Sequence, residues 1–388
     1  MTDTQSRTLA LAKQLIACRS ITPDDAGCLA LVEARLSVAG FTCERIDRGG
    51  VSNLWARHGT GAPLVCLAGH VDVVPTGPVE QWSVPPFDAV ERDGFLIGRG
   101  AADMKASVAA MVTAAERLAM AGTAHAGSIA LLLTADEEGD ALHGTVAVVD
   151  ALRRRGTRLD YCLVGEPTSA SRFGDTIKNG RRGSLSGLLR VKGIQCHVAY
   201  PERGRNPIHD AAPALAELAT TQWDAGNEYF GPTTFQISNI HAGTGAPNVV
   251  PGTLEVQFNL RFSPQSPAPR LQERVQAVLD RHGVEYELAW TISAEPFMTP
   301  EGDLVEAVRE AVMEETGVTP ALSTSGGTSD GRFLAAIAEQ VVEFGPMNDT
   351  IHKIDERIAV ADLGLLSAIY EGVMRRLLGL SGPRAHEA

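Results

Sequence analysis

Residues 128–140, SIALLLTADEEGD, join an apolar run to a group of acids, and this stretch decides the expected fold. The run Ile129–Leu133 has the length and composition of a buried strand. It leads into Asp136, Glu137 and Glu138, and adjacent carboxylates repel one another and raise one another's pKa. We therefore expect a compensating positive charge close to the end of this strand.

The segments around this stretch alternate between strand-like and helix-like patterns. PLVCLAGHVDVV (63–74) and LDYCLVGEPT (159–168) are typical of buried strands. KASVAAMVTAAERLAMAG (105–122) is typical of an Ala-rich helix that ends at Gly122. Short apolar strands that alternate with helices predict an α/β domain with a mostly parallel central sheet.

The pattern changes near residue 183, where strands and helices follow in the order β-α-β-β-α-β. This order is typical of a ferredoxin-like α+β domain. We predict that residues 183–295 form an inserted domain and that residues 1–182 and 296–388 form the α/β domain. The six expected elements are 184–193, 206–220, 233–243, 253–263, 267–283 and 284–292, with HVAYP (197–201) as an additional strand-like segment.

Composition narrows the class of protein. The 388 residues carry a net charge of -13, which disfavours binding to nucleic acid or to anionic lipid. The N-terminal segment predicts an amphipathic helix with no signal peptide, and no apolar run is long enough to span a membrane. We expect a cytoplasmic protein whose six scattered cysteines are free thiols.

Histidines and acids recur just after the expected strands or just before a helix. GHVDVVP, GRGAADMK, TADEEG, VGEPT and FGPMNDTIHKIDE each supply at least one of them. In open parallel sheets, ligands bind beyond the carboxyl ends of the strands, so separate segments can deliver these side chains to one place. The residues are His70, Asp72, Asp103, Glu137, Glu138, Glu166 and His352.

A metal centre explains this set of side chains. Carboxylates stay ionised around a divalent cation, and mixed imidazole and carboxylate ligands suit zinc. Two Zn²⁺ would balance Asp103, Glu138, Glu166 and one hydroxide, with one imidazole for each metal. Glu137 is then left as a general base, and Asp72 lies where it can hold the second ring nitrogen of His70. Each motif alone also fits a surface turn or a chance pair, but five such segments in α/β order favour the metal centre.

The motifs GHVDVVP, GRGAADMK, TADEEG, VGEPT and IHKIDE resemble those of the zinc-dependent di-metal aminoacylase and exopeptidase family, which includes acetylornithine deacetylases, carboxypeptidases and tripeptidases. The resemblance implies two Zn²⁺, one of them replaceable by Co²⁺. It assigns His70 and Glu166 to one metal, His352 and Glu138 to the other, and Asp103 to both. It also implies a cis peptide bond between Asp103 and Met104.

The same resemblance gives the inserted domain a role in forming a homodimer and in acting as a lid. His197 in QCHVAYP matches a histidine that reaches across the dimer to stabilise an oxyanion. The chain has Cys196 before this histidine, where relatives usually have glycine. We expect the substrate contacts to be Arg181, Asn248, Arg261, Ser325, Gly327 and Thr328.

The resemblance implies hydrolysis of the amide of an N-acyl amino acid that carries several carboxylates. Arginine matches the planar carboxylate group, which is why Arg181 and Arg261 are among the expected contacts. IKNGRRGSLSG (177–187) and STSGGTSDGRF (323–333) point to one branch within the family. Acetylornithine deacetylase or a related N-acyl amino-acid hydrolase is the alternative, and a catalytically inactive binding protein is the alternative of another class. A nucleotide-binding protein is disfavoured, because GRGAADMK has neither the G-x-G-x-x-G nor the Walker lysine pattern.

Overall fold

A computed structural model describes residues 2–122 and 126–380 of the chain and divides it into two compact units. The first unit comprises Met1–Gly180, Met298–Ser323 and Ser329–Ala388, and the second comprises Arg181–Phe297 and Thr324–Thr328. Residues 324–328, predicted to lie in the α/β domain, are grouped by their contacts with the second unit. The short strands β9 (Gly180–Arg181) and β16 (Phe297–Met298) contain two of the points at which the chain passes between the units.

The first unit is built on an eight-stranded sheet whose central strands are parallel. β3 and β6 are buried along their whole length, and their apolar residues do not alternate with polar ones. Continuous apolar runs are typical of parallel strands that are covered on both faces. In sheet order the strands are β1 (Thr42–Arg45), β2 (Asn53–His58), β6 (Ser128–Thr134), β3 (Leu64–His70), β7 (Leu159–Val164), β18 (Ala338–Glu343), β8 (Thr176–Lys178) and β17 (Ala321–Ser323).

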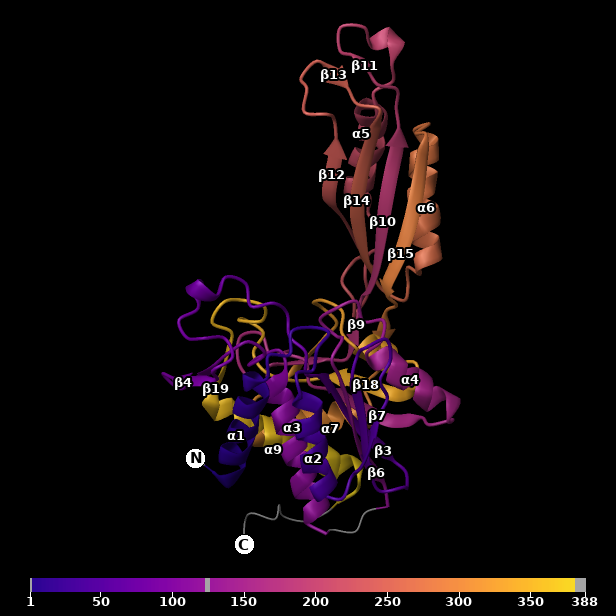
Figure 1. Cartoon of the computed structure of the whole chain (residues 1–388). Helices are drawn as coiled ribbons and strands as arrows, with labels where there is room; N and C mark the ends of the chain where they lie inside the picture. Colours follow the sequence, from indigo (N-terminus) through magenta and orange to yellow (C-terminus); the bar gives the residue numbers. More distant parts are fainter. Residues whose placement is uncertain (1, 123–125, 381–388) are drawn as a thin grey trace. The chain divides into compact units, whose positions relative to one another are not determined.

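Helices cover this sheet, with α1, α3, α7 and α9 gathered on one side and α4 on the other (Figure 1). α3 packs against both α1 and α9, and its many alanines allow this close approach because they add little bulk. The helices of the first unit are α1 (Asp3–Ala17), α2 (Cys28–Val38), α3 (Lys105–Met120), α4 (Thr145–Arg154), α7 (Asp303–Thr316), α8 (Gly331–Leu334) and α9 (Val360–Leu377). A small sheet of β4 (Val90–Arg92), β5 (Phe95–Ile97) and β19 (Arg357–Ala359) and the 3-10 turn Val79–Gln81 complete it.

The second unit has the predicted ferredoxin-like arrangement. Its strands lie in the order β12, β14, β10, β15, and all neighbours are antiparallel. Alternate residues of β14 are buried, which indicates that one face of this sheet packs against the helices. The elements are β10 (Gly183–Lys192), α5 (Pro207–Thr220), β12 (Thr234–Ala242), β14 (Thr253–Phe262), α6 (Ala268–Arg281) and β15 (Tyr286–Ala294).

Several local expectations can be compared directly with the structure. HVAYP does not form a strand of its own: β11 covers only Cys196–His197, pairs with β13 (Val249–Val250), and gives way to the 3-10 turn Pro201–Arg203. All six cysteines are free thiols, as predicted. Among the described residues, no helix is both long enough and apolar enough to cross a membrane.

Candidate metal centre

Four strands of the first unit end at the same edge of the sheet. His70 is the last residue of β3 and lies in register with Thr134, the last residue of the parallel strand β6. β7 runs parallel to β3 on its other side, and β18 runs parallel to β7. The loops that follow these strands therefore start close together, as in other parallel sheets with a ligand site.

Two groups of predicted ligands converge at this edge, and Asp103 belongs to both. One group is His70, Asp103 and Glu166, and the other is Asp103, Glu138 and His352. Within each group the ligand atoms lie within 4.8 Å of one another. Asp103 immediately precedes Met104, the residue that caps α3, and the Asp103–Met104 peptide bond is cis, as expected.

The two carboxylate oxygens of Asp103 face different imidazoles. Oδ1 lies 3.1 Å from His70 Nε2, and Oδ2 lies 3.5 Å from His352 Nε2. Each group has one further carboxylate. Glu166 Oε1 is 3.9 Å from His70 Nε2, and Glu138 Oε1 is 2.9 Å from His352 Nε2. This is the arrangement of a carboxylate that can bridge two cations, each with one further carboxylate and one imidazole.

The acids of this cluster are more easily ionised beside a positive charge. Burial raises the pKa of Glu166 well above its usual range, and the neighbouring charges of Asp103 and Glu137 raise it further. Contacts with carboxylates, first of all Asp103, raise the pKa of His352 to about 10. Burial opposes ionisation of His70, but its hydrogen bond with Asp103 and the nearby acids hold its pKa well above the usual range. Divalent cations would supply this positive charge, and nitrogen and oxygen donors of these types suit zinc.

Asp72 positions both its neighbour in sequence and the acidic turn. The carboxylate predicted to hold the second ring nitrogen of His70 lies 3.6 Å from its Nδ1, and the main-chain oxygen of Asp72 lies closer, at 2.9 Å. The buried carboxylate accepts hydrogen bonds from the main-chain N–H groups of Glu137 and Glu138, at 3.4 and 3.1 Å. A side chain that accepts two main-chain bonds fixes the turn that presents these two acids.

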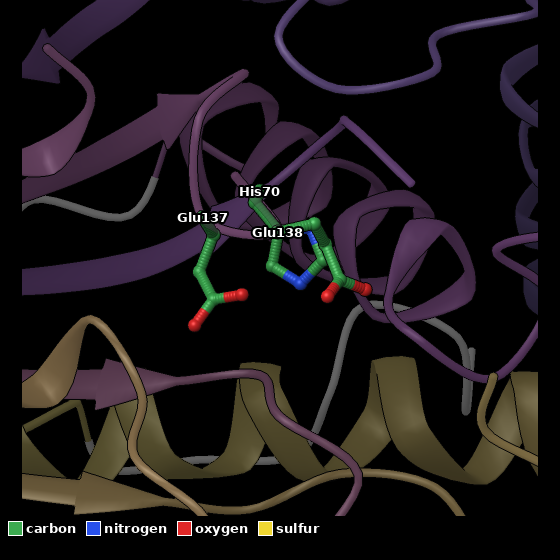
Figure 2. Close-up of side chains that lie close together, drawn as sticks. All are labelled: His70, Glu137 and Glu138. Atoms are coloured by element: carbon green, nitrogen blue, oxygen red, sulfur yellow. The ribbon is translucent and has the colours of Figure 1, made fainter. Parts of the chain in front are cut away.

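Glu137 and Glu138 project toward His70 from consecutive positions (Figure 2). Glu138 also belongs to a group around Asp103, whereas Glu137 belongs to neither. Burial raises the pKa of Glu137 well above its usual range, opposed by His70 and reinforced by the charge of Asp330. Two adjacent acids thus have different surroundings, and Glu137 has those of a proton acceptor beside the ligands.

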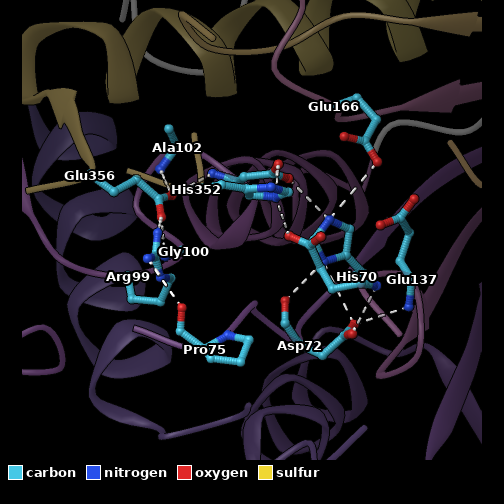
Figure 3. A network of polar contacts seen from close by, with 12 residues as sticks. His70, Asp72, Pro75, Arg99, Gly100, Ala102, Glu137, Glu166, His352 and Glu356 are labelled. Atoms are coloured by element: carbon cyan, nitrogen blue, oxygen red, sulfur yellow. Dashed lines mark hydrogen bonds and ion pairs between the residues drawn. The ribbon is translucent and has the colours of Figure 1, made fainter. Parts of the chain in front are cut away.

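Two further residues lie at this site but were given no role from the sequence. Glu356, the last residue of IHKIDE, is buried and hydrogen-bonds to the loop that carries Asp103 (Figure 3). Asp330, within STSGGTSDGRF, is buried, accepts a hydrogen bond from Thr145 at 2.7 Å, and has no partner for Oδ1 in the described part of the chain. The H-x-x-x-E pattern of His352 and Glu356 in IHKIDE was the available signal for the first, and a single acid within a Gly- and Ser-rich loop was the signal for the second.

The residues expected to contact substrate all belong to the second unit, together with His197. His197 Nδ1 accepts a hydrogen bond from the main-chain N–H of Ala199 at 3.0 Å, which leaves Nε2 as the protonated nitrogen of the neutral ring. Arg181 is buried and donates to the main-chain oxygen of Ser325 at 3.1 Å. Of the others, Arg261 lies on β14, Asn248 and Gly327 are exposed, and Thr328 is partly exposed.

The fold and the motifs agree with those of one protein family. The model of the peptidase family M20/M25/M40 matches residues 66–376, and the chain belongs to this family. The succinyl-diaminopimelate desuccinylase of Dechloromonas aromatica (strain RCB) is 60% identical over 378 residues, which cover 97% of this chain and 100% of that protein. The enzyme of the same name from Aromatoleum aromaticum (strain DSM 19018 / LMG 30748 / EbN1) is 62% identical, with coverage of 96% and 97%.

Solved structures share the fold at low sequence identity. The M20 family metallo-carboxypeptidase Sso-CP2 from Sulfolobus solfataricus has a TM-score of 0.80 at 17% identity, covering 98% of this chain and 100% of that one. The YXEP protein of Bacillus subtilis, described as a dinuclear metal-binding peptidase of the M20 family, has a TM-score of 0.75 at 16% identity, with coverage of 97% and 99%. The mixed, mostly parallel sheet with a separate antiparallel domain is therefore the fold of this family.

Proposed function

We propose that the protein hydrolyses the amide of N-succinyl-LL-diaminopimelate to succinate and LL-diaminopimelate, in the biosynthesis of lysine and of the cell wall. The observation that carries this proposal is the identity of about 60% with desuccinylases over nearly the full length of both chains. The geometry of the first unit supports it, because His70, Asp103, Glu138, Glu166 and His352 form two ligand groups that share one carboxylate.

These five side chains would hold two Zn²⁺, one of them replaceable by Co²⁺. When bound, the cations would supply Lewis acidity that polarises the amide carbonyl and lowers the pKa of water. The protein's part is to hold the ligands in place, and Asp72 does so through its contacts with His70 and with the Glu137–Glu138 turn.

Glu137 acts as the general base in this proposal. Its carboxylate lies within reach of the ligand cluster without belonging to the groups that share Asp103. It takes a proton from the attacking water and passes it to the leaving amine, as a positioned carboxylate does in general acid–base catalysis. The surroundings that raise its pKa favour this role, because a carboxylate with a raised pKa is a stronger base.

His197 stabilises the oxyanion of a partner subunit in a homodimer. Its Nδ1 is occupied by the main-chain N–H of Ala199, so Nε2–H is available as a donor. Ile194, Val198, Tyr200 and Ile240 expose between 46% and 57% of their surface in the second unit, an apolar area that a second copy would cover. Cys196 fills the space left by Gly204, where a Cβ would lie 2.4 Å from its Sγ, so the departure from the family pattern is accommodated locally.

Arg181 and Arg261 bind the carboxylates of the substrate. Arg261 is half-buried, and no carboxylate of the described residues acts on its charge. Burial and the neighbouring charge of Arg182 lower its pKa, so its surroundings lack a negative charge that an acidic substrate would bring. Asn248 and the segment with Ser325, Gly327 and Thr328 supply further polar groups. The guanidinium fork matches a carboxylate geometrically, so Arg261 is suited to bind a carboxylate of the substrate.

The decisive assay measures release of free amine from N-succinyl-LL-diaminopimelate by zinc-loaded protein. N-acetylornithine and a dipeptide are run beside it, with a chelated sample as control. We expect turnover of the succinyl substrate alone, lost on chelation. Turnover of N-acetylornithine or of the dipeptide instead would keep the metal centre and exclude the substrate. No turnover of any of the three would favour an inactive binding protein on this fold.

A further inference from the structure

Two buried charges, Arg99 and Glu356, form an ion pair beside the metal ligands without belonging to them (Figure 3). Arg99 Nη1 lies 2.8 Å from Glu356 Oε2, and the two side chains are 2% and 1% exposed. Burial of both charges is expensive unless their attraction and further hydrogen bonds compensate for it. The hydrogen-bond partners of this pair therefore indicate its role.

Glu356 binds the main chain that leads into Asp103. Its Oε1 accepts hydrogen bonds from the N–H groups of Ala102 and Asp103, both at 2.9 Å. Its Oε2 accepts from the N–H of Gly100 at 3.1 Å as well as from Arg99. One carboxylate thus takes three main-chain donors within four consecutive residues, and the last of these residues carries the shared carboxylate.

Arg99 extends the same connection to the other loops of the site. Its Nη1 donates to the main-chain oxygen of Lys353 at 3.1 Å, next to His352. Its Nη2 lies 3.3 Å from the main-chain oxygen of Pro75, in the segment that follows His70 and Asp72. The guanidinium also stacks over the ring of Trp82, with its carbon 5.2 Å from the ring centroid. A single side chain therefore contacts the segments that follow both histidine ligands.

These loops need external support. His352 has a φ of +60°, in the left-handed region that residues with a Cβ rarely occupy. Its side chain is 49% exposed, so packing does little to hold it. Asp103, Glu138 and Glu166 carry like charges that push their loops apart. Ligands keep their geometry only when the surrounding contacts fix them.

We propose that the Arg99–Glu356 pair is a positioning device that fixes the main chain of Asp103 and the loop of His352, so that both ligand groups share one carboxylate. This inference rests on the proposed metal pair. Removal of groups that orient metal ligands typically costs about 10- to 100-fold in metal affinity. Glu356→Gln keeps the size of the side chain, but an NH₂ group replaces one carboxylate oxygen. That group would face N–H donors, which need an acceptor. We expect it to weaken both metals, because Asp103 serves both.

Arg99→Met should weaken both metals as well. It removes the contacts with Lys353 and with Pro75 and leaves Glu356 without its charged partner, so we expect a loss of about 10-fold or more in affinity for each metal. Isothermal titration of the apo-protein with Zn²⁺ would measure the two affinities. The visible absorption of the Co²⁺-loaded protein would report the coordination geometry, which a change in overall stability alone does not alter.

The chain offers a matched control in Arg117 and Glu371. They form another buried pair, with Nε 2.8 Å from Oε2 and both side chains 7% exposed, between α3 and α9. Arg117→Met and Glu371→Gln should lower the melting temperature of the apo-protein while leaving metal affinity and the Co²⁺ spectrum unchanged. If Glu356→Gln or Arg99→Met does not fold, Glu356→Asp and Arg99→Lys take their place, because both retain the charge while altering reach.

Unchanged affinities and an unchanged Co²⁺ spectrum in the variants, with stability lost as in the control pair, would overturn the positioning role. A wild-type protein that binds fewer than two metals would instead contradict the proposed metal pair itself, so the two failures are distinguishable.

Discussion

The adjacent acids Glu137 and Glu138 should respond differently to the same substitution. Glu138 Oε1 lies 2.9 Å from His352 Nε2 and belongs to one of the groups that share Asp103, whereas Glu137 belongs to neither. Glu138→Gln removes a carboxylate from that group and leaves Asp103 and His352 as its ligands. We expect the purified variant to retain one metal per chain instead of two. Glu137→Gln should retain both.

The catalytic consequence of Glu137→Gln follows from its proposed role. Positioned general acid–base groups contribute roughly 10²- to 10⁴-fold to the rate. This range corresponds to about 3 to 5 kcal/mol of activation free energy. We therefore expect kcat to fall by that factor while metal content, melting temperature and KM stay close to those of the wild type.

The assay combines metal analysis of dialysed protein with steady-state hydrolysis of N-succinyl-LL-diaminopimelate. Wild type and both variants are loaded and dialysed in parallel, so that Glu138→Gln serves as the control for metal loss. Near-normal kcat in a Glu137→Gln protein with both metals would refute the assignment of the base. Loss of a metal from Glu137→Gln would show that Glu137 is itself a metal ligand, as Glu138 is, and not a base beside the ligands.

Three other predictions follow from the same geometry. Chelation should abolish hydrolysis, and added Zn²⁺ or Co²⁺ should restore it; activity that survives full removal of metal would exclude the metal centre from the reaction. Gly345→Ala would place a Cβ 2.4 Å from the main-chain oxygen of Glu166. We expect the free energy of unfolding to fall by about 1 to 3 kcal/mol and metal binding to weaken. Gly231→Ala is the control, because a Cβ there would meet no atom within 4 Å, and it should change neither quantity. Denaturant titration and metal titration check both variants, and equal stabilities would contradict the packing argument. Arg261→Met should raise KM by about 10- to 100-fold, because it removes a charge-assisted hydrogen bond to a carboxylate of the substrate. Arg190→Met is the control: it breaks an exposed ion pair with Glu255 in the same sheet and should leave KM unchanged.

The apolar runs of the sequence predicted central strands of the sheet in the first unit. Ile129–Leu133 lies within β6, and the segment before His70 forms β3, because a short continuous apolar run can be buried on both faces only in a covered sheet. The alternation of strands and helices then placed the loops at one edge. The ferredoxin-like order of the second unit was also predictable, since each of its elements is marked by its own periodicity.

Short segments were less predictable. HVAYP has the composition of a strand, yet only Cys196 and His197 pair with a neighbour, because the chain turns at Pro201. Local composition does not reveal how many residues find a partner strand. The same limit applies to residues 324–328. Their contacts group them with the second unit, and their sequence does not reveal this.

The sequence by itself determined the chemical types of the ligands and the strands that carry them, because strand length, apolar composition and chain order are properties of short segments. Only the tertiary structure decided how the ligands are held. The main-chain oxygen of Asp72 lies closer to His70 Nδ1 than its carboxylate does, and Glu356 binds the N–H of Asp103 across a separation of 253 residues. Which donors a buried carboxylate meets depends on how distant segments pack against each other, and no pattern within either segment encodes that contact.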